Sequence, residues 1–232
     1  MLYRKLKSKL FSTISSLTLA GIFLAGFATM AFAPSLPQAA KADDITPPTL
    51  PFDLAPVPDG NKLFLGTHAV GTQNYVCKPS GAGVAYVLFT PQATLFGEDG
   101  GQVITHFNSP NPLEPNTDPK VVAPEGTIRA TWQYRDTSRV WAKIHANDPV
   151  TGKKGAVTVN ESAIAWLLLD RVGSLKGPTG GDKLFGTTFV QRLNTTGGLA
   201  PKTGCSSLTD LGNTAFVPYT ADYFFYQPAD SK

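Results

Sequence analysis

Short apolar runs separated by glycine and proline make up most of the chain after residue 60. Strand-like runs at 71–77 and 83–91 flank the turn "KPSGAG", and the run 93–107 contains a hairpin turn from Glu98 to Gly101. Another hairpin, 127–146, turns at Asp136 to Ser138. Apolar runs of this length bounded by turn residues are typical of β-strands joined as hairpins. The pattern therefore predicts an all-β domain.

Alternation in the hairpin 127–146 indicates which side of the sheet is buried. Trp132 and Tyr134 share one face of its first strand, and Lys143 and His145 share one face of its second strand. Successive side chains of a strand point to opposite faces, so the charged positions separate from the apolar ones. We expect one side of this hairpin to be in contact with water.

The run "AIAWLLLDRV" at 163–172 is apolar without alternation. It fits a strand that is buried on both faces, with Trp166 in the core. A short helix capped near Asn160 or Ser162 fits the same pattern. The runs 187–193 and 219–226 are predicted as late strands.

The domain organisation follows from the stretches between these runs. Residues 43–60 are rich in proline and are predicted to form an extended lead-in. Two long segments without periodicity, 108–126 and 173–186, are expected to be loops. About nine strands in one domain over 61–228 favour a single-domain β-sandwich with long loops, for which a jelly roll is one form, over a closed barrel.

The first 42 residues have the features of a secretory signal peptide. Four basic residues precede an apolar stretch without charge from Leu10 to Ala33. Cleavage after Ala33 would place Pro34 next to the cut, so cleavage after Ala42 is favoured. We therefore expect a secreted or periplasmic protein with no stable membrane insertion once the signal is cleaved. The alternative is an uncleaved anchor, because the stretch approaches the ~20 residues that span a bilayer.

Without this segment the chain has a different net charge, and it keeps both cysteines. Five basic residues and no acidic ones lie in residues 1–42, which leaves 15 basic and 17 acidic residues in the remainder, a net charge of −2. No basic run remains, so a nucleic-acid partner is not expected. Cys77 and Cys205 are predicted to form one disulfide in an oxidising compartment.

Several segments together resemble a known family. "NYVC", "TPQATLF", "DTSRVWAKI", "FVQRLNTTGGLAPKTGC" and "YTADYFFY" are similar, in this order over roughly residues 60–226, to the DUF3455 family of exported bacterial and fungal proteins. The resemblance implies no activity and no catalytic residues. Some fungal members carry a malate dehydrogenase label, but this chain lacks a G-x-G-x-x-G motif after a strand, so that activity is considered unlikely.

No catalytic motif is recognisable, and whether the protein is an enzyme stays open at this stage. The weak candidates are His106, as a base or metal ligand, and Asp136, beside Ser138 in a turn. For His106 the alternative is a structural histidine bonded to a backbone carbonyl. No histidine pair has metal-ligand spacing, and no cofactor is predicted. Paired carboxylates for glycoside hydrolysis would come from a set of acids that mostly fits turns: Glu98, Asp99, Glu125, Asp136 and Asp222.

Two charged residues lie within apolar strand patterns. Asp222 lies among aromatic residues and Arg192 lies in "FVQRLN". Because an unpaired buried charge is costly, a buried Arg192–Asp222 pair is predicted. The alternative is a polar cluster in which Gln191 and Asn194 line a cleft together with Arg192.

The aromatic residues of the hairpin provide candidates for binding. Trp132, Tyr134 and Trp141 could form a stacking surface for a sugar, with Arg192 and Asn194 as further binding candidates. The leading prediction is a non-catalytic exported module that binds a ligand or surface, with a polysaccharide or another cell-envelope component as partner. The alternative is an exported hydrolase or lyase with a dispersed site around His106, assisted by a metal.

Overall fold

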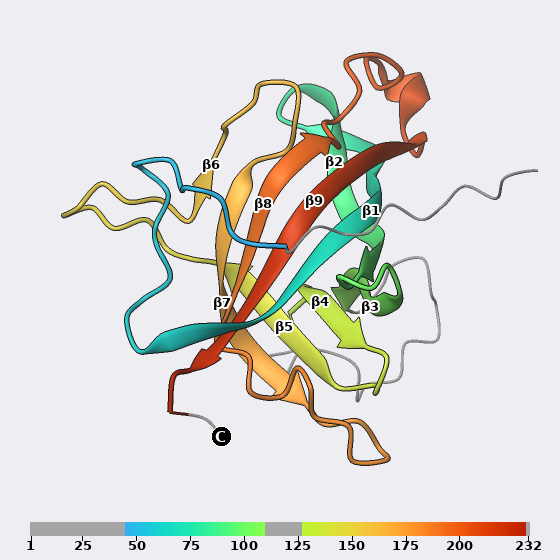
Figure 1. Ribbon diagram of the computed structural model, residues 1–232. Coiled ribbons are helices and arrows are strands. Elements are labelled where there is room, and N and C mark those ends of the chain that lie inside the picture. Colours follow the sequence, from blue (N-terminus) through green and yellow to red (C-terminus); the bar gives the residue numbers. More distant parts are fainter. Residues whose placement is uncertain (1–44, 110–126, 231–232) are drawn as a thin grey trace, which may run out of the picture. The chain divides into compact units, whose positions relative to one another are not determined.

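The computed structural model describes residues 45–109 and 127–230, which contain nine β-strands and no α-helix (Figure 1). A 3-10 helix spans Leu208–Asp210. The strands are β1 (Asn61–Ser80), β2 (Gly83–Phe96), β3 (Gln102–Ser109), β4 (Arg129–Tyr134), β5 (Arg139–Ile144), β6 (Ala156–Val157), β7 (Trp166–Leu175), β8 (Phe189–Gly197) and β9 (Thr214–Pro228). The predicted all-β class is confirmed.

The nine strands form one antiparallel sheet that closes on itself. Their order is β5-β4-β3-β2-β1-β9-β8-β7-β6, and β5 also pairs with β7. Eight strands therefore form a closed barrel. The short strand β6 pairs with β7 and is not part of this closed ring. The predicted sandwich is replaced by a barrel, because strand alternation is the same in both and only the β5–β7 pairing closes the edge.

The run 163–172 enters β7 as a strand, so the helical alternative is wrong. Leu167 and Leu169 pack in the main core, whereas Trp166 packs in a second cluster on the opposite face, and Leu168 on that face is fully buried. Both faces of the strand are thus covered, as its continuous apolar sequence predicts.

The main core lies inside the barrel. Along β9 it takes alternate residues, Tyr219, Ala221, Tyr223 and Phe225, whereas Phe224 belongs to the second cluster. This alternation follows from the two-residue period of a strand. On the outer face, Ile45, Leu50 and Leu54 from the segment before β1 pack against the outward side chains Leu193 and Phe224.

One end of the barrel is closed by the loop between β7 and β8. Leu184 of this loop is fully buried in the barrel core. Its backbone N–H donates to Ser138 Oγ at 3.0 Å, and the N–H of Lys183 donates to Asp136 Oδ2 at 2.9 Å. The loop is thus fastened to the β4–β5 turn, at the lower end of the barrel in Figure 1.

The predicted disulfide is confirmed. Cys77 of β1 is bonded to Cys205, with 5.5 Å between the Cα atoms, and ties the loop before β9 to the β1–β2 arm. The glycine pair before this loop turns the chain, with φ of 61° at Gly197 and 81° at Gly198. A Cβ at Gly198 would lie 3.0 Å from atoms of Ile164 and Tyr219. The corner therefore requires glycine both for its backbone angle and for close packing.

Residues 45–109 and 127–230 include no helix with the length and hydrophobicity that a membrane span needs. The predicted signal segment 1–42 lies outside the described residues, as does most of the predicted loop 108–126. Export therefore stays a prediction.

Candidate functional site

The end of the barrel opposite Leu184 opens into a cavity of about 690 Å³. β4 and β5 show this polarity, because their turn at Asp136 lies at the closed end while Arg129 and Ile144, at their other ends, line the cavity. Eight-stranded barrels leave an interior wide enough for one small ligand, and 300–1,000 Å³ is the usual range for such sites. The cavity is therefore of a size that suits a small molecule.

The cavity walls are mainly apolar. Residues from β2, β4, β5, β6 and β7 contribute, together with residues that precede β4 and β7. Most of them are aliphatic, and Arg129 and Lys143 are the charged ones among them. These apolar lining residues are Leu88, Pro91, Ile128, Ala130, Ala142, Ile144, Ala156, Ala165, Leu167 and Leu169. Burial of apolar ligand surface against such walls is favourable at ~25 cal/mol per Å² of surface removed from water.

His106 lies at the inner end of the cavity and is almost completely buried. Its ring stacks on the Trp132 indole, with 4.4 Å between centroids and 8° between planes. Its Nδ1 lies 2.8 Å from the Thr131 carbonyl oxygen. A carbonyl oxygen only accepts, so Nδ1 carries the proton and Nε2 of the neutral ring is the acceptor. The structural alternative from the sequence, a histidine bonded to a backbone carbonyl, is confirmed.

Burial lowers the pKa of His106 to about 3, and the Arg192 charge acts in the same direction against the opposing hydrogen bond to Thr131. The imidazole is therefore neutral near pH 7 and is poorly suited to exchange protons as a general acid or base. Among the described residues, no three metal-ligating side chains lie together, so His106 has no partners for a metal site there.

Arg192 provides the charge at the base of the cavity. On β8 it follows the inward residue Val190 by two positions, and it pairs across strands with Tyr223 of the barrel core. Its Nε and Nη2 atoms donate to the Ala165 carbonyl oxygen at 3.2 and 2.8 Å. No carboxylate of the described chain lies within ion-pair distance of this guanidinium.

The predicted Arg192–Asp222 pair is not formed. Leu193, not Arg192, is the cross-strand partner of Asp222, which places Asp222 on the outer face of the barrel. There its carboxylate accepts from His68 Nδ1 at 2.7 Å and from Asn194 Nδ2 at 2.8 Å. A shift of one residue in register reverses the face of a side chain, which is why the sequence pattern alone misplaced this pair.

Polar side chains that the sequence pattern does not single out complete the inner end of the cavity. Gln73 is almost fully buried, and its Nε2 makes no hydrogen bond of good geometry, although it lies close enough to the Tyr219 hydroxyl to lower the pKa of that phenol. Tyr219 and Tyr223 lie near Arg192, and their hydroxyl oxygens are 3.4 Å apart. Burial raises the pKa of both phenols, so both keep their protons. The alternation of "YTADYFFY" places both tyrosines on one face, but only barrel closure brings them next to Arg192.

The remaining candidates lie elsewhere. Trp132 and Trp141 are both almost fully buried, so neither ring forms the exposed stacking surface expected from the sequence. Tyr134 is partly buried, and the guanidinium carbon of Arg135 lies 5.6 Å from the centroid of its ring. Burial would raise the pKa of Asp136, but hydrogen bonds from Ser138 and Lys183 outweigh it and hold the pKa below its usual value. Asp136 therefore stabilises the closed end, away from the cavity.

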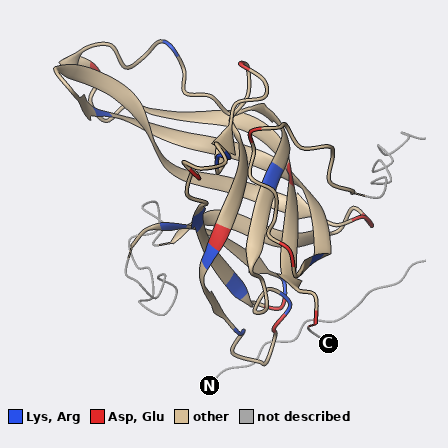
Figure 2. Ribbon diagram, turned by 90° about the vertical axis from the view of Figure 1, so that its left-hand side faces the viewer, with Lys and Arg blue, Asp and Glu red and all other residues tan. Residues whose placement is uncertain are grey.

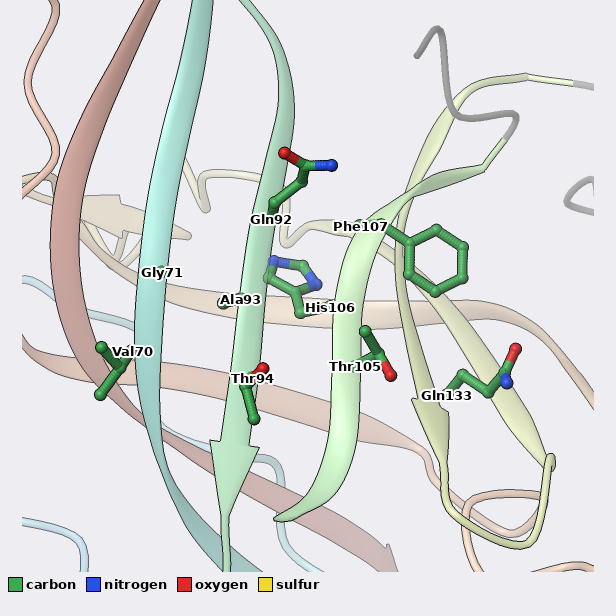
Figure 3. Close-up of a pocket in the computed structure, with 9 residues that line it drawn as sticks. All are labelled: Val70, Gly71, Gln92, Ala93, Thr94, Thr105, His106, Phe107 and Gln133. Carbon is green, nitrogen blue, oxygen red and sulfur yellow. The ribbon is translucent and has the colours of Figure 1, made fainter. Parts of the chain in front are cut away.

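A second hollow of about 520 Å³ lies on the outer face, across β1 to β4. Figure 3 shows Thr105 and Phe107 pointing to one side of β3 and the His106 ring pointing to the other, between β2 and β3. Val70, Thr94 and Gln133 complete its surface, and none of its lining residues carries a full charge. Basic and acidic positions are interspersed over the visible strands of the barrel in Figure 2.

Fold and site together define an all-β barrel protein with one closed end and a single-ended internal cavity. A family model described as a protein of unknown function, DUF3455, matches residues 58–227, and the chain belongs to this family. No curated protein and no solved structure matched the chain.

Proposed function

We propose that this protein binds a small, largely apolar organic molecule inside the open end of its barrel, without transforming it. The observation that carries the proposal is the cavity of about 690 Å³ with apolar walls and an inner end of buried polar groups. Buried polar groups normally have hydrogen-bond partners, and Gln73 Nε2 has none in good geometry. A ligand that reaches the inner end would supply an acceptor.

The alternative of a hydrolase or lyase has less support. His106 is neutral near pH 7 and stacked on Trp132, and Asp136 lies at the other end of the barrel. A polysaccharide or cell-envelope partner remains a prediction. The tryptophans of the hairpin, Trp132 and Trp141, are buried and do not support it. Export to the periplasm or medium remains part of the proposal, and the disulfide is consistent with an oxidising compartment.

Fluorescence titration of the oxidised protein with the neutral probe N-phenyl-1-naphthylamine tests the proposal. We expect saturable binding and a rise in melting temperature, since a ligand at 100 times its Kd stabilises the folded state by ~2.7 kcal/mol. The variant Ala130→Trp, which fills the cavity, should abolish the signal. Its control is Thr105→Trp on the outer face of the neighbouring strand.

The control should bind the probe as the wild type does. Absence of binding to the wild type, or equal binding to Ala130→Trp and the wild type, would refute an internal site. Both variants need the wild-type circular dichroism spectrum for this comparison.

A further inference from the structure

The inner end of the cavity has an unbalanced positive charge. Arg192 lies on the inward side of β8, between Leu167 of β7 and Tyr223 of β9. Arg192 is partly buried, and a charge that is partly removed from water is costly unless an opposite charge or several hydrogen bonds compensate it. Two N–H groups of Arg192 donate to one neutral carbonyl, that of Ala165, and no described lining residue of the cavity is acidic.

The neighbours of Arg192 add hydrogen-bond donors instead of negative charge. Gln73 Nε2 is a buried donor without an acceptor in good geometry. The phenols of Tyr219 and Tyr223 keep their protons, because burial raises the pKa of each. The guanidinium of Arg192 and the amide N–H group of Gln73 both line the cavity and are suited to an anion, since both can donate to it.

Exposed apolar side chains line the opposite end of the cavity, together with the basic residues Arg129 and Lys143. Leu88, Ile128 and Ile144 line it and expose 45%, 51% and 53% of their surface. They come from β2, from the residue before β4 and from β5, so the exposed apolar surface lies along one side of the opening. Exposed apolar residues that gather around a cavity are a common feature of ligand sites.

We propose that the ligand is an amphipathic monoanion with a carboxylate head at Arg192 and an apolar tail directed toward Leu88, Ile128 and Ile144. This inference rests on the proposed function and specifies its ligand class. A carboxylate suits the planar guanidinium, which keeps N–H groups beyond those that bind Ala165. Arg192 is the basic residue at the inner end, which favours a single negative charge there, and aliphatic residues from the inner end to the opening favour an apolar tail on the same molecule.

Competition between matched ligands tests this inference. Decanoate and decanol share a ten-carbon chain and differ in charge, and each is used to displace the neutral probe from the wild type. We expect decanoate to bind ~10-fold or more tightly than decanol, because hydrogen bonds to charged groups contribute ~1.5–3 kcal/mol and 1.4 kcal/mol corresponds to a factor of ten. Decyltrimethylammonium should displace the probe least.

The variant Arg192→Gln should remove the preference for decanoate over decanol. Arg192→Lys keeps the positive charge but loses the planar guanidinium, so it should retain part of the preference for decanoate. The control Arg171→Gln removes a guanidinium from an exposed residue of β7 and should behave as the wild type. If Arg192→Gln does not fold, the comparison of decanoate with decanol on the wild type still decides.

The outcomes separate the two proposals. Equal affinity of the wild type for decanoate and decanol, or an unchanged preference in Arg192→Gln, would overturn the inference while probe binding leaves the proposed function intact. Failure of the neutral probe to bind would overturn the proposed function itself, and the inference with it.

Discussion

At the scale of single residues, the barrel interior changes the chemistry of the groups that it contains. Burial lowers the pKa of His106 and keeps its imidazole neutral. Arg192 remains charged, because a guanidinium is not deprotonated in proteins. The same environment thus removes one positive charge and retains the other, and the retained charge at Arg192 is the basis for the proposed ligand.

The lowered pKa of His106 predicts how stability depends on pH. The unfolded chain takes up a proton at this histidine below about pH 6.5, whereas the folded protein does so only near pH 3. The contribution of His106 to the free energy of unfolding is therefore present above pH 6.5 and is lost as the pH falls toward 3, at up to ~1.4 kcal/mol per pH unit.

Urea unfolding between pH 7 and 4 measures this effect in the wild type and in His106→Gln, whose amide can still donate to Thr131. The variant should lose stability less steeply than the wild type as the pH falls. Thr105→Gln, an exposed neighbour on the same strand, should keep the wild-type slope. Parallel profiles for the wild type and His106→Gln would contradict a buried neutral histidine.

At the scale of elements, the closed end depends on a close approach between two loops. The β7–β8 loop contacts the β4–β5 turn so closely that a Cβ at Gly181 would lie 2.1 Å from the Asp136 carbonyl oxygen. That oxygen is backbone in a tight turn, so it has little freedom to move. The contact positions Leu184 as the plug of this end, and the cavity opens at the other end.

Gly181→Ala is therefore expected to destabilise the fold by about 1–3 kcal/mol, the usual cost of overpacking. Gly83→Ala is the matched control, because a Cβ there meets no atom within 4 Å. The control should change the free energy of unfolding by no more than about 0.5 kcal/mol. Equal stabilities of the two variants in urea unfolding would argue against the tight loop contact.

At the scale of the whole molecule, the disulfide and the strand order connect distant parts of the chain. Cys77 and Cys205 are separated by 128 positions, and β1 pairs with β9, which brings the first and last strands together. Long-range pairings of this kind carry a large loop-closure cost, which a crosslink in the unfolded chain reduces.

Removal of the crosslink should therefore lower the free energy of unfolding by up to about 4–5 kcal/mol in the chain-entropy description. The double variant Cys77→Ser, Cys205→Ser and the reduced wild type should unfold at the same urea concentration, well below that of the oxidised protein. A loss under about 1 kcal/mol would indicate that β1 and β9 hold this region without help from the disulfide.

The sequence by itself determined most of the strands, the turns and the disulfide, but not the short strand β6 or the end of β7, which lies in the predicted loop 173–186. The features that it determined depend on local alternation, on glycine and proline at turns, and on the presence of just two cysteines. The position of Arg192 as a charged residue within an apolar pattern is likewise evident from the amino-acid sequence. The family assignment also follows from short segments in a fixed order.

Only the tertiary structure decided that the sheet closes into a barrel, that Arg192 points inward and that Asp222 points outward. Closure depends on the pairing of β5 with β7, and the two charged residues separate because Asp222 is opposite Leu193. Alternation fixes which residues of one strand share a face, but it cannot say which face meets the interior or which strand lies beside it. Those choices belong to register and topology, and they place the charge of Arg192 at the inner end of a cavity.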